Sequence, residues 1–168
     1  MIEKNEIYFR EVQRFTQIWV MFLVAIPVVI AWYGAIQQLI LHKPFGNNPA
    51  SDPFMIVIWI VFGFLFPIFF LSVKFVTEIK KDGIYILFFP FHLKFRTMPF
   101  PSIQSYFARD YSPFKDYGGY GIRYGKQGRA YNVKGKRGVQ LNLMSGSKIM
   151  IGSQKADELV EAINRAKK

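Results

Sequence analysis

IWVMFLVAIPVVIAWYGAI at residues 18–36 and MIVIWIVFGFLFPIFFLSV at residues 55–73 are the two stretches that decide the fold. Each holds 19 residues and no charged side chain. A helix rises about 1.5 Å per residue, so each stretch would span about 28 Å, close to the hydrocarbon thickness of a bilayer. The alternative, two buried helices of a soluble core, would show shorter apolar runs with a polar face. We therefore predict a membrane α hairpin of two transmembrane helices.

The residues before the first stretch do not resemble the basic head of a cleaved signal peptide. They carry Lys4, Arg10 and Arg14 together with three glutamates. The apolar part of a signal peptide is also shorter, about 7 to 15 residues. We expect the first helix to be retained in the protein.

Basic residues are distributed unevenly along the chain. Three precede the first stretch, Lys43 lies between the two stretches, and 18 follow from Lys74 onward. Because basic flanks tend to stay inside the cell, we expect a multi-pass protein of the plasma membrane with both termini cytoplasmic. The net charge of +11 resides in the segment after the second stretch. Because this basic segment adjoins the bilayer, we expect its partner to be the anionic inner leaflet of the membrane, and we expect no nucleic-acid partner.

The pattern after residue 74 changes to short runs of alternating character that are separated by turn residues. This pattern is typical of antiparallel strands. Asp82-Gly83 and Ser145-Gly146-Ser147 are turn signals between them. A helix with Ser153 as its N-cap closes the chain. The strands are predicted at residues 75–80, 84–89, 93–98, 103–109, 121–124, 129–133, 139–144 and 148–151.

This plan predicts a mostly antiparallel β barrel or sandwich of the pleckstrin-homology-like (PH-like) type, closed by a C-terminal α-helix. The predicted division is residues 1–76, a juxtamembrane segment with the helical hairpin, and residues 77–168, a cytoplasmic PH-like domain. A domain of about 90 residues is just large enough to bury a core of its own.

Four sequence segments resemble a family of small prokaryotic two-span membrane proteins of unknown function. The segments are FREVQRF at residues 9–15, PFGNNPASD at 44–52 after Gln37 and Gln38, YGGYGIRYGKQGRAYNVKGKRGVQLNL at 117–143, and IGSQKADELVEAI at 151–163. The resemblance covers nearly the whole chain. It implies a bacterial-type PH-like domain at the C-terminus, and it implies no activity.

Alternating strand directions predict which turns face the membrane. By this count the turn with Lys134, Lys136 and Arg137 lies on the membrane side, where we expect it to bind lipid headgroups or another anion. The turn that contains Phe89 and Phe91 returns to the same side, as interfacial aromatic residues would. The alternatives are a solvated hairpin tip for the basic residues and ordinary core packing for the phenylalanines.

The apolar stretches offer a packing face but no chemistry. Ala31 and Ala35, with Gly34 beside them, form a face of small residues on which a second helix packs. Neither stretch contains an aspartate, glutamate, histidine, lysine or arginine, which argues against a proton or ion pathway. The chain has no cysteine and two histidines, and its sequence contains no recognisable catalytic or metal-binding pattern. We predict no enzyme, no cofactor and no metal.

The expected function is a non-enzymatic, membrane-anchored binding or scaffold module. Its PH-like domain would contact a partner protein or anionic lipid headgroups, and the protein would form a homo-oligomer or associate with a partner membrane protein. The alternative is a subunit of an oligomeric channel or transporter. A pore requires polar side chains along one helical face, and the stretches show none, so the binding module is favoured.

Overall fold

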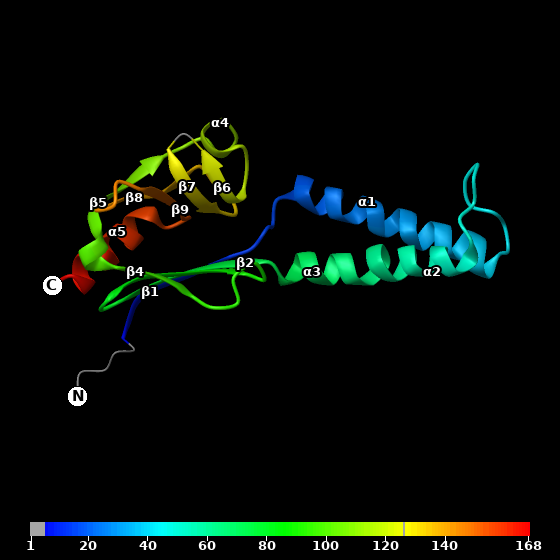
Figure 1. Cartoon of the computed structure of the whole chain (residues 1–168), viewed down its shortest axis with the longest axis horizontal. Coiled ribbons are helices and arrows are strands. Elements are labelled where there is room, and N and C mark those ends of the chain that lie inside the picture. The colour runs from blue at the N-terminus through cyan, green and yellow to red at the C-terminus, as the bar shows by residue number, and fades with distance from the viewer. Residues whose placement is uncertain (1–5, 126) are drawn as a thin grey trace. The chain divides into compact units, whose positions relative to one another are not determined.

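The structure is a computed structural model that describes residues 6–125 and 127–168. The described residues form two compact units (Figure 1). One is a helical hairpin of residues 16–73, and the other is a β unit that combines residues 6–15 with residues 74–168. The predicted division after residue 76 differs from this arrangement, because the segment before the first helix is a strand of the β unit.

Two long helices make up the hairpin unit, and both are long and apolar enough to cross a membrane. Only 22% and 11% of their most apolar windows are buried, whereas the core helix of a soluble protein would be mostly buried. Each extends three or four residues further toward the connecting loop than its apolar stretch. The first comprises α1 (Ile18–Ala35) and the π-helical turn η1 (Ile36–Ile40); the second comprises α2 (Asp52–Ile60), the π-helical turn η2 (Val61–Leu65) and α3 (Phe66–Ser72).

Tryptophan side chains pack the middle of the hairpin around a glycine. The Trp32 and Trp59 rings meet edge to face with centroids 5.2 Å apart, and Phe64 lies 5.2 Å from each. The Trp32 indole N–H donates to the Gly63 carbonyl of η2 at 3.4 Å. A Cβ atom at Gly63 would lie 3.0 Å from the Trp59 ring and 3.2 Å from the Trp32 nitrogen, so a larger residue would require these indole rings to shift.

The first sheet of the β unit contains a strand that the sequence does not predict. Its order is β1-β2-β3-β4, all antiparallel. In β1 the buried face carries Phe9, Glu11 and Gln13, so two of its three inward side chains are polar and the usual alternation is absent. The predicted strand at residues 93–98 is shorter in the structure. The strands are β1 (Ile7–Gln13), β2 (Lys74–Lys80), β3 (Gly83–Phe89) and β4 (Arg96–Pro99).

The second sheet follows a short 3-10 helix, η3 (Phe100–Ser102), and has the order β5-β8-β9-β7-β6. β7 and β9 pair in parallel, as alternation requires of two strands with β8 between them in the chain, and successive strands within each sheet run in opposite directions. The assignment of particular turns to the membrane side stays a prediction. The two sheets are not closed into a barrel. The strands are β5 (Ile103–Asp110), β6 (Gly121–Gly125), β7 (Gly128–Asn132), β8 (Arg137–Leu143) and β9 (Lys148–Gly152), with a short helix α4 (Pro113–Tyr117) between β5 and β6.

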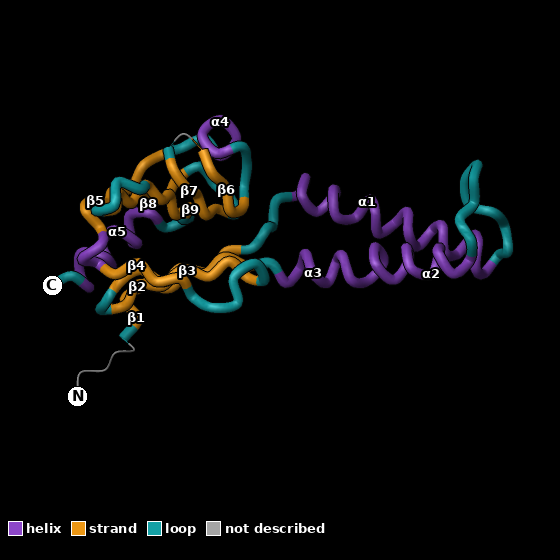
Figure 2. Tube along the Cα trace, viewed as in Figure 1, coloured by secondary structure: helices purple, strands orange, loops and turns teal. Residues whose placement is uncertain are grey.

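The C-terminal helix α5 (Ala156–Ala166) packs against strands of both sheets (Figure 2). Its Leu159 and Ile163 are fully buried, as are Phe75 of the first sheet and Leu141 of the second. The predicted N-cap is displaced: Lys155 occupies the cap position, and the Ser153 hydroxyl accepts the Lys155 N–H at 2.9 Å in the turn before the helix.

Candidate functional site

One end of the first sheet carries both connections to the helical hairpin. Gln13, the last residue of β1, is the register partner of Phe75, and Lys74, the first residue of β2, is the partner of Phe89. Gln13 lies five residues before α1, and one residue separates Lys74 from α3. We call this end of the sheet, marked by Gln13, Lys74 and Phe89, the entry end.

A loop with exposed apolar side chains leaves the sheet at the entry end. It joins β3 to β4 through residues 90–95, and Phe91 is 62% exposed and Leu93 79% exposed. Phe89 is half-buried, and the Lys74 ammonium lies 5.7 Å from its ring centroid. Phe89 and Phe91 were predicted from the sequence as interface residues, and their contact with a membrane stays a prediction. Leu93 was missed because residues 93–98 were assigned to a strand.

Two arginines from different sheets meet at one tyrosine beside this loop. Arg129 of β7 donates from Nη1 to the Tyr131 hydroxyl at 3.1 Å, and Arg96 of β4 donates from Nη1 to the same oxygen at 3.5 Å. Tyr131 is 1% exposed, and its ring stacks on Phe75 with centroids 6.2 Å apart. The Arg129 guanidinium also lies 4.7 Å from the centroid of the Tyr124 ring. We call Arg96 and Arg129 the arginine pair.

A histidine borders the arginine pair. The His92 ring lies 5.9 Å from the Tyr131 ring in an edge-to-face arrangement. Burial, followed by the charges of Arg96 and Arg129, lowers the pKa of His92 below its usual 6.5. Near neutral pH the imidazole is therefore uncharged, and the positive charge of this region comes from the arginine pair.

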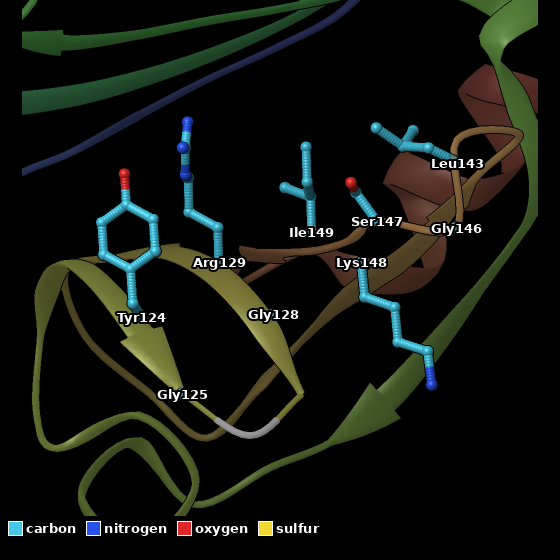
Figure 3. A pocket seen from close by; sticks show the side chains of 9 residues that line it. All are labelled: Tyr124, Gly125, Gly128, Arg129, Leu143, Gly146, Ser147, Lys148 and Ile149. Atoms are coloured by element: carbon cyan, nitrogen blue, oxygen red, sulfur yellow. The ribbon is translucent and has the colours of Figure 1, made fainter.

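A pocket of about 610 Å³ opens beside Arg129 (Figure 3). Its walls come from the ends of β6 and β7 and from the turn that joins β8 to β9. Figure 3 shows the side chains of Tyr124 and Arg129 extending to the same side of the second sheet, whereas Lys148 extends to the other. The lining residues are Tyr124, Gly125, Gly128, Arg129, Leu143, Gly146, Ser147, Lys148 and Ile149.

The predicted basic residues lie together in the turn from β7 to β8, but their environments differ. Lys136 is exposed, and the Lys134 carbonyl accepts the Gln154 amide at 2.9 Å. Arg137 forms an ion pair with Asp157 at 2.8 Å, so its charge is already balanced by an exposed carboxylate. Binding of lipid or another anion by Lys134, Lys136 and Arg137 stays a prediction.

The predicted helix-packing residues are all buried in the hairpin unit. Ala31 is 3% exposed and Ala35 is 4% exposed. Gly34 faces the connecting loop, where a Cβ atom would lie 3.0 Å from the Phe45 ring. Ala31 also lines a cavity of about 440 Å³ together with Met55 of α2.

The titratable side chains do not assemble a metal or catalytic centre within the described part of the chain. No group of three or more histidine, aspartate or glutamate side chains there is placed to hold a metal ion. Tyr111 is buried, and burial raises its pKa to about 12, so it stays protonated and neutral. The arrangement at the arginine pair is suited to holding an anion.

Comparison with known proteins gives one family. The model of a family of unknown function, DUF6141, matches residues 2–168. The chain belongs to this family. No curated protein and no solved structure matches the chain significantly. No activity is established for the family.

Proposed function

We propose that this DUF6141 protein is a non-enzymatic, membrane-anchored binding module. Its hairpin spans the plasma membrane, and its β unit is a cytoplasmic, PH-like domain that rests on anionic lipid headgroups. The observation that carries the proposal is the strand register, which joins both apolar helices to the entry end and starts the exposed loop of residues 90–95 there.

The register also constrains the topology. β1 precedes the first helix and β2 follows the second, and the two strands pair along their length. If both helices cross the bilayer, residues 6–15 and 74–168 must therefore lie on the same side of it. The 18 basic residues from Lys74 onward favour the cytoplasmic side.

The chemistry of the entry end fits a membrane interface. Burying an exposed leucine side chain such as Leu93 contributes about 2 kcal/mol, and each basic residue near an anionic leaflet contributes about 1 kcal/mol. Lys74, Lys94 and Arg96 lie in or next to the loop. A domain that is already tethered needs only a few such contacts to keep one orientation.

A fluorescence experiment tests the proposal in the full chain. The protein has no cysteine, so Leu93→Cys gives one labelling site for an environment-sensitive dye. In bilayers that contain phosphatidylserine, we expect blue-shifted emission and quenching by lipids with a spin label near the headgroup.

The matched control is Met144→Cys, which labels a side chain that is 69% exposed. The Met144 N–H donates to the Ser102 carbonyl, and Ser102 follows β4 at the end of the first sheet opposite the entry end. Its dye should report water and remain unquenched. A dye at residue 93 that behaves like the dye at residue 144 would reject the proposal.

A further inference from the structure

Arg96 and Arg129 are adjacent cations without a carboxylate partner. Within the described residues, neither guanidinium has an aspartate or glutamate oxygen within 4.0 Å; the ion pairs found there belong to Glu78, Asp157 and Glu158. Both groups instead share one neutral phenol oxygen. Like charges repel, so this arrangement favours an anion that can bridge them.

The donors of the arginine pair are largely available. A guanidinium carries five N–H donors, and each member of the pair spends one on Tyr131. Arg109 provides a contrast, because Gln127, Gln140 and Tyr117 surround its guanidinium at 2.7 to 3.3 Å and occupy it with neutral acceptors. The arginine pair therefore has the capacity for forked hydrogen bonds that Arg109 lacks.

A phosphate group matches this pair in charge and shape. Its oxygens accept the parallel N–H bonds of a guanidinium fork, and a phosphomonoester carries between about −1.5 and −2 charges at neutral pH. The arginine pair presents two positive charges to the ligand. His92 is neutral near pH 7 and adds no third charge. The pocket of about 610 Å³ beside Arg129 has room for a headgroup.

The place of the pair in the fold indicates where the phosphate comes from. Arg96 directly follows the exposed loop of residues 90–95, and Tyr131 stacks on Phe75 at the entry end. We propose that Arg96 and Arg129, held together by the Tyr131 hydroxyl, bind the phosphate group of an anionic membrane lipid. This inference rests on the proposed function and names the ligand of its membrane-facing surface.

The test uses the full chain in a maltoside detergent, which contains no phosphate. Binding of dioctanoyl phosphatidic acid is measured by titration calorimetry. The double variant Arg96→Gln/Arg129→Gln should raise the Kd at least tenfold. Tyr131→Phe keeps the ring and the net charge but releases both guanidinium groups, so it should raise the Kd several-fold.

The matched control removes the same charge elsewhere. Lys81→Gln/Arg165→Gln changes exposed residues of the β2–β3 turn and of α5, and it should change the Kd less than twofold. Arg96→Lys/Arg129→Lys keeps the charge without the forks, so a loss of affinity with this variant supports the proposal even if the glutamine variant does not fold.

Three outcomes would overturn the assignment. The first is unchanged affinity in folded Arg96→Gln/Arg129→Gln protein, and the second is equal weakening by the control pair. The third is inorganic phosphate that binds as tightly as the lipid, which would make the ligand a soluble phosphate. The dye at residue 93 reports membrane contact independently, so failure of this site and failure of the proposed function are distinguishable.

Discussion

Glu11→Ala should open the β unit at the N-terminal strand. Glu11 is 9% exposed, and its carboxylate accepts the Ser153 hydroxyl at 2.6 Å and the Gln154 N–H at 2.9 Å. A net hydrogen bond to a charged group contributes about 1.5 to 3 kcal/mol. Glu11→Ala removes two such bonds, and it also removes the unfavourable burial of the carboxylate, which offsets part of the loss. The attachment of β1 should therefore be destabilised by about 3 kcal/mol.

Hydrogen exchange of the full chain in detergent measures this loss locally. A change of about 1.4 kcal/mol corresponds to a factor of 10 in an equilibrium constant, so the amides of β1 and of its partner β2 should exchange roughly a hundredfold faster. Glu6→Ala is the matched control, because Glu6 is exposed and its carboxylate accepts the Tyr8 hydroxyl at 3.1 Å at the surface. Its effect should stay below about 0.5 kcal/mol.

A double-mutant cycle with Ser153→Ala tests the cause. Since Ser153 and Glu11 share a hydrogen bond, the two losses should not add, and we expect a coupling energy of about 1 to 2 kcal/mol. Additive losses, or exchange in Glu11→Ala that matches Glu6→Ala, would refute the reasoning that a buried carboxylate holds β1 in place.

Replacing residues 14–74 by Asn-Gly, which joins Gln13 to its register partner Phe75, should give a folded β unit that needs no detergent. Residues 77–168 alone lack β1 and should aggregate. Sedimentation and amide NMR spectra distinguish the two proteins. The pKa of His92 is lowered in the folded state, so the unfolded state takes up the proton first as the pH falls. The free energy of unfolding should therefore decrease as the pH drops below about 6.5. In urea titrations, His92→Gln should reduce this pH dependence. Gly63→Val should overfill the contact of the two helices and cost about 1 to 3 kcal/mol, seen as a lower midpoint in unfolding by sodium dodecyl sulfate.

Features of the chain that depend on local sequence could be predicted. The two apolar helices follow from runs without charge, and the Asp82-Gly83 turn does connect β2 and β3. The sequence did not predict β1, because its buried face carries the polar residues Glu11 and Gln13 in place of an apolar alternation. Their hydrogen-bond partners, Ser153 and Gly152, lie about 140 positions away, so no local sequence pattern predicts these bonds.

The candidate site shows the same limit. Sequence proximity favoured Lys134, Lys136 and Arg137 as the basic site, since they fall within four positions of each other. The arginine pair combines residues 33 positions apart, Arg96 and Arg129, and only the packing of one sheet beside the other brings both to Tyr131. The placement of β9 beside β7, from which β8 separates it in the sequence, likewise depends on long-range packing that single turns do not specify.

The position of β1 ahead of the hairpin links assembly of the β unit to biosynthesis. A ribosome makes β1 first, yet its partner β2 appears only after both apolar helices have been synthesised. An insertion error that left the two flanks on opposite sides of the bilayer would keep these strands from ever meeting. The edge of β2 and the partners of Glu11 would then stay exposed, which would give a quality-control protease a way to recognise the misinserted chain.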